Sequence, residues 1–447
     1  MIEGLRPYPD MKPSGVRWLG DLPAGWEVHR AKRAFREVDE RSERGDEELL
    51  SVSHKTGVTP RSQKNVTMFM AESYEGHKVC RAGDIVVNTM WAWMAALGVT
   101  REIGIVSPAY GVYRPRSTAQ FDPKYLDYLL RTEVYRAEYV RSSRGITTSR
   151  LRLYPPDFLS IPFIQPPLAE QRLIVRFLDW HGAQAAKLIR AKQNALELMA
   201  EQRDVLTHEV IATSGAQPMR LDVVTDLFLR PVARESAEIY TPVGLFNRGR
   251  GIFRKTPTRG DELGDSSFFW IEDGDLILSG QFAWEGAIAL AGPDEDGCVA
   301  SHRYHILRGK EGILQTTYLA SFLRTRLGQL LLDEHSRGAA GRNRPLNIRT
   351  LRKEKIPVPP QAQQERLVEI VTLENQLANS IARFSERLRE FRGRLIADVV
   401  TGKLDVRAVA ATLPEVTDLE PVEEPEESEE IEGFDDSDDV VDKEAAA

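Results

Sequence analysis

Two stretches, 166-PPLAEQRLIVRFLDW-180 and 359-PPQAQQERLVEIVTLEN-375, decide the fold of this chain. Each double proline follows a segment that contains Ile-Pro, at Ile161-Pro162 and at Ile356-Pro357, and each opens a long helical pattern. Proline is tolerated in the first turn of a helix because the amide that it lacks would be unpaired there. The sequence therefore predicts two long helices, the first over about residues 168–211.

The second helical pattern carries a seam with the heptad spacing of a helix that packs along a partner helix. Its positions are Ile370, Glu374, Leu377, Ile381, Phe384, Leu388, Phe391 and Leu395. The first helix carries a less regular apolar stripe, interrupted by His181 and Lys192. Its positions are Ile174, Leu178, Ala185, Leu188, Leu196, Met199, Leu206 and Val210. At about 1.5 Å per residue each helix is roughly 60–65 Å long, so it needs support along its flank. We expect the two helices to pack on each other, the alternative being two unrelated surface helices.

The composition excludes several classes of protein. The 447 residues leave room for two to four domains, and no apolar run is long enough to span a bilayer. Cys80 and Cys298 lie far apart without His or Cys at ligand spacing, so neither a disulfide scaffold nor a structural zinc site is expected. We expect a cytoplasmic protein without a membrane segment.

The formal net charge of -8 hides a basic body. Residues 415–447 hold 16 acidic residues against Lys443 alone, which leaves 58 basic and 51 acidic residues in the rest of the chain. A segment of this composition is expected to be disordered. It is either a solubilising tail or a competitor of nucleic acid for the basic body.

A second set of landmarks shows that the chain is a tandem repeat. Gly83-Asp84-Ile85 recurs as Gly274-Asp275-Leu276, shifted by 191 positions, and Ser143-Arg144-Gly145 recurs at Ser336, shifted by 193 like the two Pro-Pro helices. A near-constant shift indicates a duplicated unit, here a globular module plus a long helix. Two such copies tend to be related by an approximate two-fold axis. The helices would then run antiparallel, with a module at each end, which suits a DNA site with two separated halves.

The candidate DNA-binding residues lie in basic loops that also contain Ser, Thr, Asn and Gly, and in Trp-containing segments. Arginine can bond guanine, Asn and Gln can bond adenine, and hydroxyl groups can bond phosphate. In the first module the candidates are Arg61, Lys64, Asn65, Asn88, Trp91, Trp93, Arg141, Ser143, Arg144, Thr147, Thr148 and Arg150. In the second module they are Asn247, Arg248, Arg250, Arg254, Lys255, Gln281, Trp284, His302, Arg303, Arg337, Arg342, Asn343 and Arg344. Each loop alone could be a solvated surface, and each Trp could be a core residue; occurrence at matching places favours DNA.

Motifs of catalysis are missing from the sequence. It contains no Walker loop, no zinc-protease motif, no nucleophile elbow and no Asn-Pro-Pro-aromatic motif of amino-methyltransferases. We therefore expect no catalytic site, no metal site and no cofactor site in this chain.

Together these features resemble the specificity (S) subunits of type I restriction–modification systems. The resemblance rests on the opening 12-KPSGVRWLGDLPAGWEV-28, on the two Pro-Pro helices, and on the closing 395-LIADVVTGKLDVR-407. The second helix opens with Gln361-Ala362-Gln363-Gln364 where the first has Leu168-Ala169-Glu170-Gln171, and the acidic tail lies outside the family core, so its role stays open.

The resemblance implies an α+β fold with two target recognition domains, each followed by a long helix, and an antiparallel coiled coil between the helices. The implied parts are an N-terminal target recognition domain (1–165), a first spacer helix (166–214), a C-terminal target recognition domain (215–358), a second spacer helix (359–407) and a disordered acidic tail (408–447). Each recognition domain would read one half of a bipartite target in double-stranded DNA, and the helices would set the gap between the halves.

The resemblance also implies the partners. Two methyltransferase (modification) subunits would bind S-adenosylmethionine and methylate adenine, and restriction/translocase subunits would use ATP and Mg²⁺. This chain would itself be non-catalytic. Two alternatives stay open at this point: a stand-alone sequence-specific DNA-binding regulator, and an enzyme with an active site of an unfamiliar kind.

Overall fold

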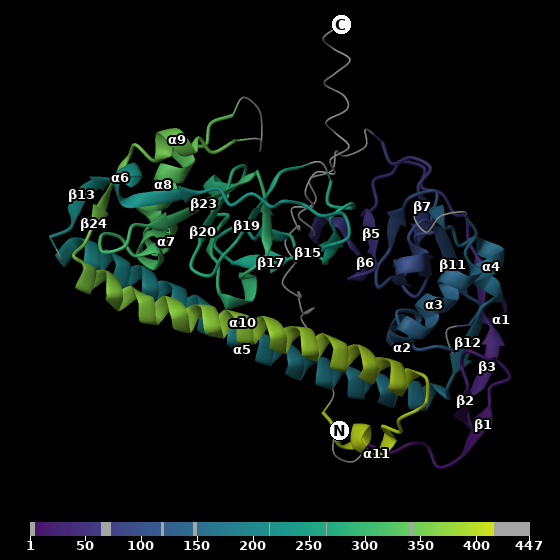
Figure 1. Ribbon diagram of the computed structural model, residues 1–447. Coiled ribbons are helices and arrows are strands. Elements are labelled where there is room, and N and C mark those ends of the chain that lie inside the picture. The colour runs from purple at the N-terminus through teal and green to yellow at the C-terminus, as the bar shows by residue number, and fades with distance from the viewer. Residues whose placement is uncertain are drawn as a thin grey trace, which may run out of the picture. The chain divides into compact units, whose positions relative to one another are not determined.

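The computed structural model describes residues 5–63, 73–117, 120–145, 150–213, 215–264, 266–338 and 344–414. Its longest elements are α5 (Leu168–Thr213) and α10 (Gln361–Val400), the two helices that the double prolines predict (Figure 1). The carbonyls of Pro167 and Pro360 accept the first helical hydrogen bonds, from Gln171 and Gln364 among others. The prolines thus sit just before the helices, where their missing amides leave no helical bond unmade.

The chain divides into two compact units, and each contains part of both long helices. Unit 1 is built from Met1–Leu188 and a later stretch that begins at Ser385; unit 2 is built from Ile189–Phe384. In unit 2, Lys192 lies over the Phe384 ring at 4.9 Å, Arg203 bonds Glu374 at 2.5 Å and Glu209 pairs with Arg366 at 3.1 Å. Numbers rise along α5 as they fall along α10, so the helices run antiparallel.

The same antiparallel pairing occurs in unit 1. Ile174 and Leu178 of α5 share a buried cluster with Leu395 and Val399 of α10. The two helices lie side by side in Figure 1. Within each unit they pack on each other through buried apolar residues. The prediction of an α+β chain with two packed, antiparallel long helices is confirmed.

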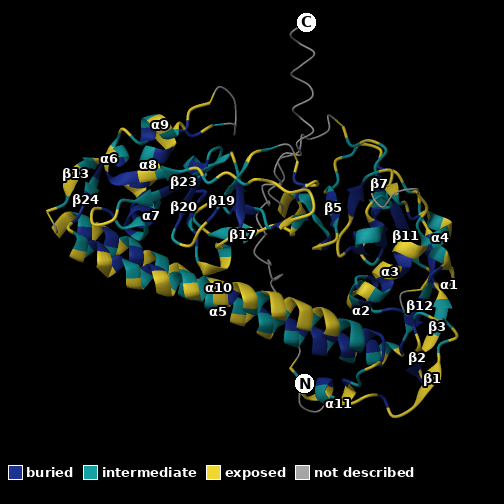
Figure 2. Cartoon of the chain, in the orientation of Figure 1, coloured by how far each residue is buried: buried dark blue, intermediate teal, exposed yellow. Residues whose placement is uncertain are grey.

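Two positions of the predicted seam are wrong. Leu188 is 46% exposed and Phe391 is 47% exposed, whereas Ala186 and Leu395 are buried. Buried and exposed residues alternate along both long helices (Figure 2). A straight α-helix drifts by about 20° per heptad relative to a strict seven-residue repeat, so a seam extended over several turns leaves the interface. Glu374, the polar position of the predicted seam, does face α5 through its bond to Arg203.

The globular part of unit 1 is built around a four-stranded antiparallel sheet in the order β4-β11-β8-β9. Its strands and short helices are β1 (Met11–Pro13), β2 (Asp21–Pro23), β3 (Glu27–Arg30), α1 (Ala31–Ala34), β4 (Phe35–Glu37), β5 (Leu50–Ser53), β6 (Gly57–Pro60), η1 (Arg61–Gln63), β7 (Lys78–Cys80), β8 (Ile85–Val87), η2 (Ala92–Met94), β9 (Leu97–Val99), β10 (Gly104–Val106), β11 (Gly111–Pro115), α2 (Pro123–Leu130), α3 (Glu133–Ser142), α4 (Pro155–Ser160) and β12 (Pro162–Gln165). The last strand before α5, β12, pairs with β3. This pairing ties the start of the domain to the start of its long helix.

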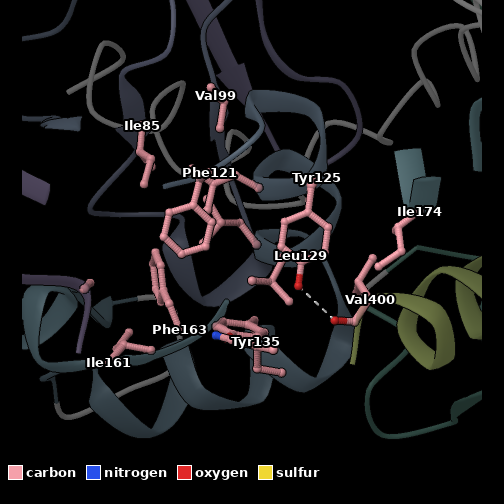
Figure 3. Close-up of a cluster of buried hydrophobic side chains, with 14 of the residues drawn as sticks. Ile85, Val99, Phe121, Tyr125, Leu129, Tyr135, Ile161, Phe163, Ile174 and Val400 are labelled. Carbon is pink, nitrogen blue, oxygen red and sulfur yellow. Dashed lines mark hydrogen bonds between the residues drawn. The ribbon is translucent and has the colours of Figure 1, made fainter. Parts of the chain in front are cut away.

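The core of unit 1 is completed by the C-terminal part of the chain. Buried Tyr125 donates a hydrogen bond from its hydroxyl to the carbonyl of Val400 at 3.1 Å (Figure 3). Val406 and Ala410, the latter in α11 (Arg407–Thr412), belong to the same buried cluster. Tyr8 donates to Glu170 at 2.5 Å and lies under the guanidinium group of Arg407. The first domain therefore needs residues from both ends of the described chain.

The globular part of unit 2 repeats the same plan. Its central sheet has the order β14-β23-β20-β21, which matches β4-β11-β8-β9 strand for strand. Its elements are β13 (Gln217–Arg220), α6 (Leu221–Val224), β14 (Thr225–Phe228), β15 (Ile239–Tyr240), β16 (Val243–Leu245), β17 (Ile252–Arg254), β18 (Thr258–Arg259), β19 (Phe268–Trp270), β20 (Leu276–Ser279), η4 (Ala283–Glu285), β21 (Ile288–Leu290), η5 (Pro293–Glu295), β22 (Val299–Ser301), β23 (Tyr304–Gly309), α7 (Thr316–Arg324), α8 (Arg326–Glu334), α9 (Ile348–Leu351) and β24 (Lys355–Val358). Here β24 pairs with β13, as β12 pairs with β3. The predicted duplication is thus present in the topology of each unit.

The repeat extends to single hydrogen bonds. The buried side chain of Gln171 accepts from the amide of Asp122 and donates to the carbonyls of Gln120 and Pro166. Gln364 makes the same three bonds, to Gln315, Ile313 and Pro359. In each unit this glutamine fastens the loop before α2 or α7 to the first turn of the long helix. Buried backbone groups require such partners, which explains why both helices keep Gln at this position.

Candidate nucleic-acid interface

In unit 2 the candidate residues gather around the short helix η4. The indole of Trp284 donates to the carbonyl of Gln281 at 3.2 Å, and the guanidinium group of Arg344 lies 4.6 Å from the centre of the Trp284 ring. Arg344 is itself held by the carboxylate of Asp333 at 2.7 Å and the carbonyl of Ser336 at 3.0 Å. Nε and Nη2 of Arg344 make these bonds, which fix its guanidinium plane over the face of the Trp284 ring.

The basic loop at 247–251 is attached to the end of η4. The amide side chain of Asn247 donates to the carboxylate of Glu285, and the backbone amides of Arg248 and Gly249 donate to the carbonyls of Glu285 and Gly286 at 2.9 and 2.8 Å. Arg248 is exposed and has φ of 59°, a conformation that favours glycine. Backbone in this region persists where the surroundings fix it, and it is common at binding sites.

Other candidates of the second module lie at opposite ends of the β16–β17 hairpin. Arg250, which lies 5.2 Å from the centre of the Phe246 ring, is at the same end as Arg248, and burial lowers the pKa of its guanidinium group. Arg303 is adjacent as well, because its carbonyl accepts from the amide of Gly280 at 2.6 Å. Arg254 and Lys255 lie at the other end of the hairpin, where Arg254 donates to the carbonyl of Asp294. The structure therefore does not bring these last two residues to η4.

Two further residues of the second module flank this region. His302 is exposed, and its backbone amide donates to the carbonyl of Ser267 at 2.9 Å. Arg337 is exposed after the end of α8 and donates to the carbonyl of Glu334 at 3.1 Å. Both side chains thus stay at the surface of unit 2.

In unit 1 the equivalent short helix, η2, contains Trp93 and directly follows Trp91. The indole of Trp93 donates to the carbonyl of Met90 at 3.1 Å, the same bond that Trp284 makes. The Trp91 ring stacks on Trp93 with 6.2 Å between centroids and 17° between planes. Trp91 is 50% exposed, which excludes the core role that was its alternative. A half-exposed aromatic held by a second ring offers a rigid apolar surface.

A basic segment, which we call the basic strap (residues 141–145 and 150–154), runs beside η2. The backbones of Arg144 and Arg152 exchange two hydrogen bonds of 2.9 Å, and the amide of Leu153 donates to the carbonyl of Thr89 at 3.0 Å. Arg150, the first residue of the second part of the strap, is exposed. Exposed Arg152 and half-exposed Tyr154 belong to the same surface but were not predicted, although they follow Arg150 directly in the sequence.

The remaining side chains of the first module show how the strap is held. Arg141 pairs with the buried carboxylate of Glu138 at 2.5 Å, and Arg144 pairs with Asp157 at 2.8 Å. Ser143 donates to the carbonyl of Tyr139 at 2.7 Å, which uses its hydroxyl hydrogen within the fold. Charged partners hold the two guanidinium groups at the surface, since both side chains are 70% exposed.

Asn88 does not fit the prediction. It is only 6% exposed; its amide donates to the Tyr110 hydroxyl at 2.9 Å and its carbonyl accepts from the amide of Met90 at 3.2 Å. Both halves of the side chain shape the turn before η2, so Asn88 presents no free group to a base edge. Arg61 begins η1 near the same hydroxyl, since its charge opposes the rise that burial causes in the pKa of Tyr110.

Six candidates lie outside the described residues, and they are Lys64, Asn65, Thr147, Thr148, Arg342 and Asn343. Across the described ranges, no group of three or more His, Cys, Asp or Glu side chains is arranged to hold a metal ion. Within the same ranges, no helix combines the length and the apolar character that crossing a membrane demands.

Comparison with known proteins identifies the fold. No protein-family model and no curated protein sequence matches the chain. Among solved structures, a similar chain belongs to the work described as "Structural basis underlying complex assembly and conformational transition of the type I R-M system"; it is 17% identical, with a TM-score of 0.52, over 85% of this chain and 98% of that chain. This chain has the same fold as that chain.

Two further similar structures carry lower scores. The HsdS subunit from Thermoanaerobacter tengcongensis is 18% identical, with a TM-score of 0.40, over 86% of this chain and 98% of its own. The type I restriction–modification S subunit from M. genitalium is 13% identical, also with a TM-score of 0.40, over 84% and 96%. Each unit of this chain has one aromatic turn, at η2 or at η4, with basic segments on its flanks.

Proposed function

We propose that this chain is the DNA sequence-recognition subunit of a type I restriction–modification complex. Each globular domain reads one half of a bipartite target, and the long helices set the gap between the halves. The observation that carries the proposal is the repeated aromatic turn, with Trp93 in η2 and Trp284 in η4, flanked by arginines in two copies of one domain that each lead into a long helix. Aromatic and arginine side chains together suit base edges, T methyl groups and phosphates.

The proposed division of labour follows the domain boundaries. Residues 1–165 and 215–358 are the two target recognition domains, and residues 166–214 and 359–407 are the spacer helices. The sequence predicts a disordered tail from residue 408, but α11 reaches Thr412 and its Ala410 is buried in the core of unit 1, so the acidic tail begins after α11. Recognition depends on the groups that reach the grooves and on the shape of the DNA. The chain carries out no chemistry itself in this proposal.

The proposed partners supply the chemistry. Two methyltransferase subunits bind S-adenosylmethionine and methylate one adenine in each half-site, and restriction/translocase subunits use ATP and Mg²⁺. A base inside a duplex must be flipped out before it can be methylated, and that step belongs to the methyltransferase subunits. The recognition subunit determines where on the duplex they act.

The test is co-expression with the cognate methyltransferase subunits, followed by mapping of methylated adenines across the host genome. The expected result is one bipartite motif with a fixed gap. Replacing residues 38–150 by the equivalent region of another recognition subunit is expected to change one half of the motif and to leave the other half and the gap unchanged. Tight specific binding by the purified chain alone, with no methylation in the co-expressing strain, would instead indicate a regulator.

A further inference from the structure

A buried carboxylate on a long helix lies beneath the globular domain of unit 2. Glu374 occupies a seam position of α10 and accepts from Arg203 of α5 at 2.5 Å. A second guanidinium group, that of Arg324, lies 3.9 Å from the same carboxylate oxygen. Arg324 is the last residue of α7, so the carboxylate joins the globular domain to both long helices.

The other side of Arg324 faces the basic loop of the candidate interface. A side-chain carbon added at Gly249 would lie 3.4 Å from Nε of Arg324. The loop that carries Asn247 and Arg248 therefore rests on the guanidinium group that Glu374 holds. Loop, helix α7 and the helix pair form one continuous set of contacts in unit 2.

Unit 1 has the same arrangement with different residues. Asp179 of α5 is 6% exposed and accepts from the ammonium group of Lys124 at 2.7 Å and from the hydroxyl of Tyr128 at 2.8 Å. Both donors belong to α2, the counterpart of α7. In each unit, then, the helix that follows the central sheet is attached to a buried carboxylate about three to four turns into the long helix.

The ionic cluster in unit 2 is costly in free energy to bury, which argues against a role in stability alone. Nε of Arg324 and Oε2 of Glu374 are buried without a hydrogen-bond partner among the described residues. Burial, together with the charge of Arg203, lowers the pKa of Arg324 to about 10. Asp204, the other acidic partner of Arg203, is 41% exposed and compensates only in part. Apolar side chains can replace buried ionic groups of this kind without loss of stability, whereas polar groups can fix one geometry among several.

We propose that Glu374 with Arg203 and Arg324, and Asp179 with Lys124 and Tyr128, are positioning residues that fix the orientation of each globular domain on the helix pair. This inference rests on the proposed function, because a fixed orientation is what turns helix length into a fixed gap between half-sites. The residues touch no DNA in this role. They select the gap and leave the half-site sequences to the domains.

The test compares Glu374→Gln and Asp179→Asn with the control Glu209→Gln. Glu209 also pairs across the two helices, with Arg366, but half of its side chain is exposed and no globular domain takes part in the pair. A triple variant, R203L/R324L/E374L, removes the ionic cluster while it keeps the site apolar, so that it separates folding from orientation. Orientation is measured by electron–electron resonance between nitroxides at Gln329 of α8 and Ala382 of α10, which are exposed, whereas both native cysteines are buried.

In Glu374→Gln and in the triple variant we expect a broader distribution of distances between the two nitroxides. In the co-expressing strain we expect about tenfold more methylation at sites whose gap is one base pair longer or shorter, a factor that corresponds to ~1.4 kcal/mol. The triple variant is expected to melt no lower than wild type. An unchanged distance distribution, or an unchanged gap despite broadening, overturns the inference. If wild type methylates no bipartite site, the proposed function fails, and the distance distributions alone decide whether the residues fix orientation.

Discussion

Replacing Gln364 by Leu tests whether the repeated glutamine fastens the domain to its helix. The side chain is fully buried, and its oxygen accepts from the amide of Gln315 at 2.7 Å while its nitrogen donates to the carbonyls of Ile313 and Pro359 at 2.9 and 2.7 Å. Leu has a similar volume but leaves all three backbone groups unpaired. Each unpaired buried group costs about 1–3 kcal/mol, so the smallest sum is about 3 kcal/mol.

Calorimetry measures this loss. For a unit of this size, 1 kcal/mol lowers Tm by roughly 2–4 °C, so the transition of unit 2 should move down by roughly 6–12 °C. The control is Gln363→Leu, one residue earlier, which removes only an exposed bond to Arg366 and should cost less than about 0.5 kcal/mol. Equal effects of the two substitutions would refute the reasoning. Gln171→Leu should match Gln364→Leu in unit 1, because the three bonds are the same.

Three further outcomes are expected. Burial lowers the pKa of His305; an imidazole held neutral binds fewer protons when folded than when unfolded, where its pKa is about 6.5, so stability should fall as pH drops from about 7.5 to about 5.5. Chemical denaturation should show a smaller fall for His305→Gln. Trp91→Ala should weaken target binding by the assembled complex about fivefold, equivalent to ~1 kcal/mol, with an unchanged Tm, and a lowered Tm would return Trp91 to a structural role. Binding should drop roughly 10³-fold between about 50 and 200 mM salt, and a flat response in a filter-binding assay would exclude phosphate contacts by the basic loops.

The sequence predicts the architecture better than it predicts the surface. The Pro-Pro motifs and the constant shift identify two long helices and a duplication, because proline placement and repetition depend on local geometry. The heptad pattern places Leu188 and Phe391 in the interface, where the structure exposes them. Their exposure depends on where a straight helix leaves its partner, which seven-residue spacing alone does not contain.

The same limit applies to the candidate interface. Trp91 and Trp93 are residues of the same type, and they lie close together in the sequence, yet only Trp91 is strongly exposed. Asn88 looks equally suited to a base contact, but the Tyr110 hydroxyl, 22 residues away, takes its amide. Such partners are set by tertiary structure, so a residue's type and its loop cannot show whether its hydrogen bonds are already used.

The core of the first domain has a consequence for how the protein is made. Leu178 is buried together with Ala410, which follows it by 232 positions. At about 5–20 residues per second, a ribosome needs roughly 10–50 s to deliver the missing part. The second domain has all its core residues soon after it leaves the ribosome. In the first domain, Tyr125 and its apolar neighbours stay exposed to solvent until the C-terminal core residues have been synthesised. Nascent chains stalled before Val399 should therefore recruit chaperones to the domain that was synthesised first.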